Sequence, residues 1–159
     1  MRAGLREGAL VVRFDCRDAG TVATLVHRDE PLWREDVCEV FLSPFDAPSV
    51  YFEFEVNPLG ALFDSRIESP EGRRETMTTD VSWNLPGFSG RSRVRPGHWS
   101  VVLSIPLAPL APAGIPRTWR ANFFRIDRGA TDELSAWSPP LADPPDFHVP
   151  AKFGFLDLL

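Results

Sequence analysis

Polar and apolar side chains alternate along the segment VYFEFEVN, residues 50–57. In an extended chain its polar side presents Tyr51, Glu53, Glu55 and Asn57 at steps of roughly 7 Å. Two carboxylates and an amide in a row can accept and donate hydrogen bonds to a polyhydroxylated ligand. A solvated outer face of a β-sheet would give the same pattern, so this strand alone leaves a binding face and a plain outer face open.

A third carboxylate, Glu39, lies in the alternating segment over residues 37–42. A proline-containing turn separates this segment from residues 50–57, so we expect the two to pair as an antiparallel hairpin. Glu39 facing Glu53 or Glu55 could perform acid–base chemistry on a glycosidic bond, provided that one carboxyl has a raised pKa. The same carboxylates could equally accept hydrogen bonds from sugar hydroxyls without catalysis.

Two tryptophans, Trp33 and Trp137, lie in segments rich in charge or proline rather than inside alternating strands. Exposing an indole is costly, which favours a role in stacking against a ligand. Arg120 and Asn122 share one face of a further expected strand and add hydrogen-bond donors. Flat aromatic rings with carboxylates, an amide and a guanidinium suit a sugar ring, whose C–H face stacks while its hydroxyls are bonded.

Other chemistries find little support in the sequence. The histidines at positions 27, 98 and 148 are not clustered with one another or with cysteine, which argues against a zinc site. We find no nucleophile elbow, phosphate-binding loop or dinucleotide-binding glycine pattern. Cys16 and Cys38 each share a face with apolar residues and are predicted to be buried thiols, with a disulfide between adjacent strands as the alternative.

The elements that must position these residues are short strands. The pattern predicts strands over residues 9–16, 37–42, 50–56, 61–67, 99–105, 119–126 and 153–158, a weak hairpin over 81–94, a charged loop over 68–80 and one helical turn at 106–110. We therefore expect an all-β fold, an antiparallel β-sandwich of the immunoglobulin-like or jelly-roll type with few short helical turns. The predicted core contains Val40, Leu42, Phe52, Phe54, Val56, Val102 and Phe123.

Length and composition limit the classes of function. At 159 residues we expect one domain over residues 1–159, and 16 prolines argue against long helices. A net charge of −5 and a pI near 5.2 disfavour nucleic acid and anionic membranes as partners. No apolar run approaches the ~20 residues of a membrane-spanning helix, and the N-terminus lacks the apolar region of a signal peptide. The compartment is not indicated.

Six segments, taken in order, resemble the family-nine carbohydrate-binding modules and their wider β-sandwich relatives. The likeness runs from about Ala9 to the C-terminus. The segments are LWREDVCEVFLSP, YFEFEVNPLGALFD, WSVVLSIPLAPL, WRANFFRIDR, SAWSPP and FHVPAKFGFL.

The resemblance implies a β-sandwich that binds a mono-, oligo- or polysaccharide without catalysis, often beside a glycoside hydrolase partner. It implies a sugar held between two tryptophans: Trp33, six residues before its acidic partner Glu39, and Trp137. Glu53, Asn57, Arg120 and Asn122 join this ligand-binding set from their strand positions. It also implies structural calcium, for which Asp15, Asp18 and Asp64 are the candidate ligands.

One departure and two alternatives accompany the resemblance. Members usually have a strand region before the one that begins at Ala9, and we expect that region to be absent here. A small glycoside hydrolase using Glu39 with Glu53 or Glu55 is the first alternative function. A structural or haem-binding sandwich is the second; it would need an axial histidine or methionine pair, and Met1 and Met77 are the only methionines.

Overall fold

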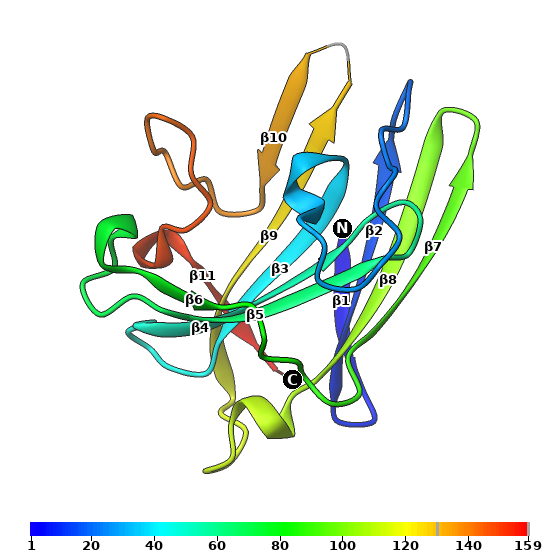
Figure 1. Cartoon of the computed structure of the whole chain (residues 1–159). Helices are drawn as coiled ribbons and strands as arrows, with labels where there is room; N and C mark the ends of the chain where they lie inside the picture. Colours follow the sequence, from blue (N-terminus) through cyan, green and yellow to red (C-terminus); the bar gives the residue numbers. More distant parts are fainter. Residues whose placement is uncertain (130, 159) are drawn as a thin grey trace.

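The fold consists of β-strands joined by loops and short 3₁₀ turns. A computed structural model describes residues 1–129 and 131–158 (Figure 1). Among the described residues no helix is long and apolar enough to cross a bilayer. The strands are β1 (Arg2–Arg6), β2 (Ala9–Arg17), β3 (Val37–Ser43), β4 (Val50–Val56), β5 (Leu62–Glu68), β6 (Thr78–Asp80), β7 (Ser89–Arg95), β8 (His98–Pro106), β9 (Thr118–Arg128), β10 (Asp132–Ala136) and β11 (Gly154–Asp157). The 3₁₀ turns are η1 (Leu32–Arg34), η2 (Arg74–Thr76), η3 (Ala108–Leu110) and η4 (Pro150–Lys152).

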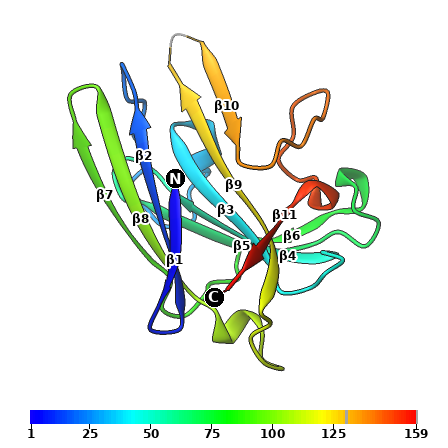
Figure 2. The ribbon, with the colours of Figure 1, turned by 180° about the vertical axis from the view of Figure 1, so that it is seen from behind.

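The strands form two antiparallel sheets that face each other. One sheet has four strands in the order β1-β2-β8-β7. The other has seven, in the order β10-β9-β3-β4-β5-β6, with β11 also paired to β9. Figures 1 and 2 show the two sheets from opposite sides. The expected antiparallel β-sandwich with a few short helical turns is therefore confirmed.

The main core fills the space between the two sheets. In β2 and β8 buried and less buried residues alternate strictly, so each strand turns one apolar side inward. Val40, Leu42, Phe52, Phe54, Val56 and Phe123 lie in this core as predicted. Val102 does not: Val101 and Leu103 point inward, and Val102 lies on the outer side of β8. Two consecutive valines leave the inward face of a strand ambiguous, which explains the wrong assignment.

Several elements differ from the sequence-based expectation. Arg2–Arg6 forms strand β1 against β2, so a strand does precede Ala9. The expected hairpin over residues 81–94 is wrong: this stretch contributes only β7, which pairs with β8. Two short strands, β6 and β10, arise where no apolar alternation predicts them, because each is held by backbone pairing to a longer neighbour.

The seven-stranded sheet is buried on its outer face as well. All seven residues of β3 are buried, although only alternate ones point toward the four-stranded sheet. A second apolar cluster of Phe41, Tyr51, Ile67, Phe124 and Phe153 covers the outer face. In Figure 1 the segments around η2 and between β10 and β11 lie together beside this sheet. The outer face of the seven-stranded sheet is therefore covered, whereas the sequence alone left a solvated outer face open as one of two alternatives.

Cys16 and Cys38 are free thiols that meet in the core between the two sheets. Both are buried, and their sulfur atoms are 3.6 Å apart, one on each sheet. The prediction of buried thiols is confirmed, and the two strands that carry them belong to facing sheets rather than to adjacent positions in one sheet.

Replacing Phe54 by Ala should destabilise the fold by about 3–5 kcal/mol, because the ring is fully buried between the sheets. Val102→Ala is the matched control on the outer side of β8 and should cost less than ~1 kcal/mol. Urea unfolding followed by tryptophan fluorescence measures both. Equal losses in the two variants would contradict the assignment of inner and outer faces.

Candidate functional site

A cleft of about 980 Å³ opens on the outer face of the seven-stranded sheet. Trp33 and Phe63 line one part of it, Glu39 and Glu53 lie in it from the central strands, and the loop that follows β10 closes another side. The lining comprises Trp33, Glu39, Glu53, Phe63, Gly72, Arg73, Arg74, Glu75, Met77, Thr79, Val81, Ile126, Arg128, Leu134 and residues 142–149. Its size lies within the range of small-molecule binding sites.

The indole of Trp33 is held at the edge of the cleft while remaining accessible. Its neighbour Leu32 in η1 is fully buried, whereas Trp33 is 40% exposed. The indole packs edge-on against Phe63, with ring centroids 5.3 Å apart and an interplanar angle of 75°. Arg128 donates a hydrogen bond from Nη2 to the carbonyl oxygen of Trp33 at 3.0 Å. A half-exposed indole in a fixed orientation provides a flat apolar surface for a ligand.

Three carboxylates meet on the sheet beneath the cleft. Glu39 lies directly opposite Glu55 in the β3–β4 register, and Glu53 follows on the same side of β4. One carboxylate oxygen of each lies within 4.8 Å of the others. Ser65 donates a hydrogen bond to Glu53 at 2.8 Å, whereas neither oxygen of the fully buried Glu55 has a hydrogen-bond partner among the described residues.

Burial strongly affects the protonation of this cluster. It raises the pKa of Glu39 well above the ordinary value, and the nearby charge of Glu53 raises that pKa further. The pKa of Glu55 is also raised well above its ordinary value, first by burial and then by Glu39 and Glu53. A protonated carboxyl is a donor as well as an acceptor, so the cluster can both give and accept hydrogen bonds.

Aromatic and thioether side chains enclose another side of the cleft. Phe147 stacks on Phe124 with ring centroids 4.1 Å apart and an interplanar angle of 12°. The Tyr51 hydroxyl lies 2.9 Å from Nδ1 of His148 and donates to the sulfur of Met77 at 3.4 Å. Burial lowers the pKa of His148, which favours the neutral imidazole near neutral pH.

Trp137, the second tryptophan expected at the site, lies elsewhere. Ala136 pairs with Phe124, whose side chain lies on the outer face of the sheet. The side chain of the next residue, Trp137, therefore falls on the inner face, where it packs against Phe123 at a centroid distance of 5.5 Å. A Cβ placed on Gly154 would lie 2.3 Å from its ring, so the indole rests on that glycine. Trp137 is not part of the cleft lining, and the two indoles do not face each other across it.

Three other predicted ligand residues form hydrogen bonds with backbone groups: Asn57, Asn122 and Arg120. Asn57 accepts hydrogen bonds from the N–H groups of Leu59 and Ala61 and donates to the carbonyl of Leu25. Asn122 donates to the carbonyl of Ser138 at 2.7 Å and accepts from its N–H at 2.9 Å.

Arg120 ties loops together in the same way. It donates to the carbonyl oxygens of Phe153, Asp46 and Ala151, and its guanidinium lies over the ring of Phe155. None of Asn57, Arg120 and Asn122 lines the cleft. These polar side chains therefore fix the loops around the site rather than enter it.

Several residues that line the cleft have no strong signal in the sequence. Phe147 and His148 follow a proline-rich loop, where a packing role is the simpler explanation. Arg73 and Arg74 come from the segment expected to be a charged loop. Arg74 pairs with Asp146 at 2.9 Å and so joins the two covering segments, a contact that only the fold creates.

A second acidic cluster lies where β9 meets the chain before β3. One carboxylate oxygen each of Asp18, Asp36 and Asp127 lies within 4.8 Å of the others. Asp36 accepts hydrogen bonds from the N–H groups of Val22 and Arg128, while one oxygen of buried Asp18 has no hydrogen-bond partner among the described residues. Arg125 lies 2.6 Å from Asp127 and 4.0 Å from Asp18 and supplies a counter-charge.

The other two calcium candidates have different surroundings. Asp15 is paired with Arg13 on the outer side of β2. Asp64 is buried, bonded to Arg28 and to the N–H of Leu85. Within the part of the chain that the structure describes, Asp18 is the one predicted ligand that belongs to a carboxylate cluster.

Comparison with known families decides the relationship. The family model described as carbohydrate-binding family 9 matches residues 1–158. This chain belongs to carbohydrate-binding family 9. The family consists of non-catalytic carbohydrate-binding modules, which at the level of this domain argues against the hydrolase alternative.

Individual relatives share this fold at low sequence identity. A candidate carbohydrate-binding protein from Bacteroides uniformis superposes with a TM-score of 0.77 at 23% identity, covering 95% of this chain and 73% of that one. Family 9 modules from Caldicellulosiruptor kristjanssonii in complex with glucose and with cellotriose give TM-scores of 0.66 and 0.67 at 16% and 17% identity. The alignments cover 99% and 98% of this chain and 74% and 72% of the two modules.

A longer relative is known from its sequence. An extracellular protein from Arthroderma benhamiae is 27% identical over an alignment 140 positions long, which covers 79% of this chain. The match spans 61% of that protein's length, so this chain corresponds to only part of it.

Replacing Glu55 by Gln should stabilise the fold at pH 7.5 and above. The raised pKa means that the folded state binds the Glu55 proton more tightly than the unfolded state does. The contribution of this proton to stability is therefore complete below about pH 4.3, the ordinary pKa of glutamate, and is lost as the pH rises through the folded-state pKa. Glutamine is neutral at every pH, so it needs no proton uptake on folding, and it can donate to the neighbouring carboxylates; we therefore expect a gain of about 1–3 kcal/mol that shrinks toward pH 4.

Urea unfolding at several pH values measures this effect. The control is Glu133→Gln on exposed β10, which should leave the pH dependence unchanged. A loss of stability in the Glu55 variant at pH 7.5 would contradict the assignment of an unpaired buried carboxylate.

Proposed function

We propose that this chain binds a neutral saccharide in the cleft, with a sugar ring stacked on Trp33 and its hydroxyls bonded by Glu39 and Glu53. The observation that carries the proposal is the half-exposed indole beside buried carboxylates in a cleft of about 980 Å³. Burying the apolar face of a sugar against an indole lowers the free energy of the complex. Hydroxyl groups of the sugar can supply the hydrogen bonds that buried carboxyl groups need.

The comparisons support the choice of ligand class. Two solved structures of family 9 carbohydrate-binding modules with the same fold are complexes, one with glucose and one with cellotriose. Glucose and short β-linked glucans are therefore the first ligands to test. Phe147 and His148 also line the cleft, and we propose that they supply the second wall that the sequence assigned to Trp137.

Replacing Trp33 by Ala should weaken the binding of glucose or cellotriose by about 1–3 kcal/mol, the usual effect of removing a central aromatic contact. Isothermal titration calorimetry measures the affinity. Trp137→Ala is the matched variant, also about half exposed but on the other side of the sheet. Its affinity should lie within about threefold of the parent chain's. A threefold change is less than about 1 kcal/mol, because tenfold corresponds to about 1.4 kcal/mol.

The same titrations decide between one indole and two. A loss in Trp137→Ala equal to that in Trp33→Ala would support the sequence-based prediction of a sugar held between both tryptophans. No loss in Trp33→Ala, with saturable binding retained, would refute the proposed cleft.

We also propose that Asp18, Asp36 and Asp127 can hold a calcium ion. Hard oxygen ligands suit this ion, and the unpartnered oxygen of Asp18 is the feature that fits it. Arg125 competes for the same carboxylates. The ion would brace the chain around Asp36, three residues after Trp33, and so keep η1 in place.

Millimolar calcium should raise the melting temperature, and a chelator should reverse the change. Asp127→Asn should abolish the response, whereas Asp15→Asn on the outer side of β2 should retain it. Differential scanning calorimetry measures the shifts. An unchanged melting temperature in the parent chain would mean that Arg125 alone neutralises the cluster.

The wider role follows from the relatives. A glycoside hydrolase that acts on the same polysaccharide is the partner we propose for such a binding chain. The relative from Arthroderma benhamiae is called an extracellular protein, which supports a place outside the cell, where polysaccharides are met.

A further inference from the structure

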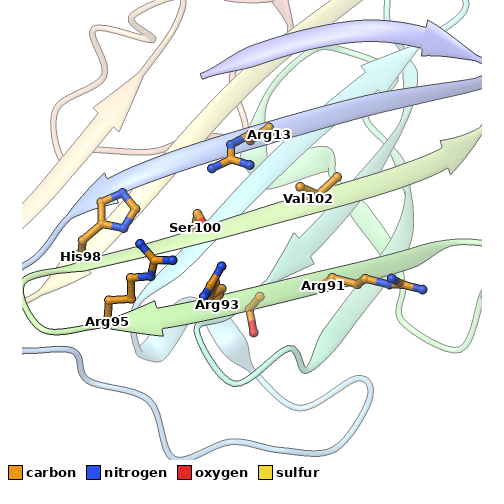
Figure 3. A pocket seen from close by; sticks show the side chains of 8 residues that line it. Arg13, Arg91, Arg93, Arg95, His98, Ser100 and Val102 are labelled. Carbon is orange, nitrogen blue, oxygen red and sulfur yellow. The ribbon is translucent and has the colours of Figure 1, made fainter.

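The outer face of the four-stranded sheet is strongly basic. Arg91, Arg93 and Arg95 alternate along β7 and point to the same side, as Figure 3 shows. The register places Arg93 opposite Ser100 of β8, and Ser100 opposite Asp15 of β2. A shallow pocket of about 260 Å³ lies between these side chains. The basic face, as we define it, consists of Arg2, Arg13, Arg17, Arg91, Arg93, Arg95 and His98, with Asp15 as its one acidic residue.

The charge on this face is opposite to that of the whole chain. Six arginines against one aspartate give a formal charge of +5, and since the chain carries −5, the remainder carries −10. Only Arg13 is neutralised, by Asp15 at 2.6 Å; the ion pairs between described residues do not include Arg91, Arg93 or Arg95. Such a segregation of charge attracts a polyanion.

Protection of a sheet edge does not explain the pattern. Charged residues on an edge strand discourage pairing with another chain, and β7 is an edge strand. However, Arg13 lies in the part of β2 that is paired on both sides, and His98 belongs to β8, which is also paired on both sides. Basic residues that continue over the interior of the sheet form a face rather than an edge.

We propose that the basic face binds a linear polysaccharide that carries carboxylate groups. Guanidinium groups match carboxylates with two parallel hydrogen bonds, and alternate arginines on β7 lie roughly 7 Å apart along the strand. Ser100 and His98 lie among the arginines and can bond sugar hydroxyls. This site lies on the opposite side of the sandwich from the Trp33 cleft and does not depend on that cleft's function.

Two other polyanions fit the face less well. The basic face has no Phe, Tyr or Trp side chain to form a stacking platform for nucleic acid bases, and His98 is its one aromatic ring. Val102 is the one apolar side chain that lines its pocket, too small a surface for insertion into a membrane interface. A flat, polar, cationic surface suits an extended, hydroxyl-rich chain of carboxylates.

Binding of polygalacturonate to the full chain tests the proposal, by affinity electrophoresis and calorimetry at about 20 mM and about 300 mM NaCl. We expect binding that weakens at high salt. The double variant Arg91→Gln/Arg93→Gln should bind roughly threefold to thirtyfold more weakly at low salt, given the modest strength of exposed ion pairs. Arg34→Gln/Arg117→Gln removes the same charge from exposed positions off the face and should bind as the parent does.

Further arms separate this site from others. Arg17→Gln/Arg95→Gln provides a second pair should the first variant fold poorly. Trp33→Ala should keep full affinity for polygalacturonate even where it loses neutral sugars, so failure of the cleft leaves this proposal intact. Parent-like binding by both face variants, or equal weakening in the off-face control, would overturn it. So would equal or tighter binding of polyphosphate or single-stranded DNA under the same conditions.

Discussion

Burial of β3 and β4 on both faces is the constraint from which the rest of this structure follows. The inner sides of these strands meet the four-stranded sheet, and their outer sides meet the segments around η2 and between β10 and β11. A strand covered on both sides cannot leave its polar groups to solvent. Glu39, Glu53 and Glu55 must therefore be satisfied by one another, by Ser65 or by whatever enters the cleft.

The cleft exists because this covering is incomplete. Phe41, Phe124 and Phe153 fill the outer face at one end, whereas the Glu39 end is left open between Trp33 and the loop at Phe147. Around the opening, Asn57, Arg120 and Asn122 bind backbone groups of loops that would otherwise be free to move. Recognition and rigidity are thus divided: acidic and aromatic groups face the opening, and amide and guanidinium groups hold its frame.

Sequence reasoning succeeded where alternation is strict and failed where distant segments meet. The pattern of residues 50–57 predicted the correct inner face, and the class of fold followed from many such strands. The paired valines at 101 and 102 carried no such information. Trp137 was correctly placed outside the alternating strands, but one residue of register in the unpredicted strand β10 decides which side of the sheet it occupies. Phe147 and His148 reach the cleft only through long-range packing, which local sequence patterns do not record.

Because positive charge is concentrated on the outer face of the four-stranded sheet while the rest of the chain is acidic, the molecule has a permanent electric dipole with its positive end at the basic face. Near a negatively charged wall or gel, such a dipole experiences a torque that turns the four-stranded sheet toward the surface. The cleft then points away from the surface into solution. If the two proposed sites are both functional, a chain oriented in this manner would present the Trp33 cleft to a second, neutral polymer and act as a tether between two materials.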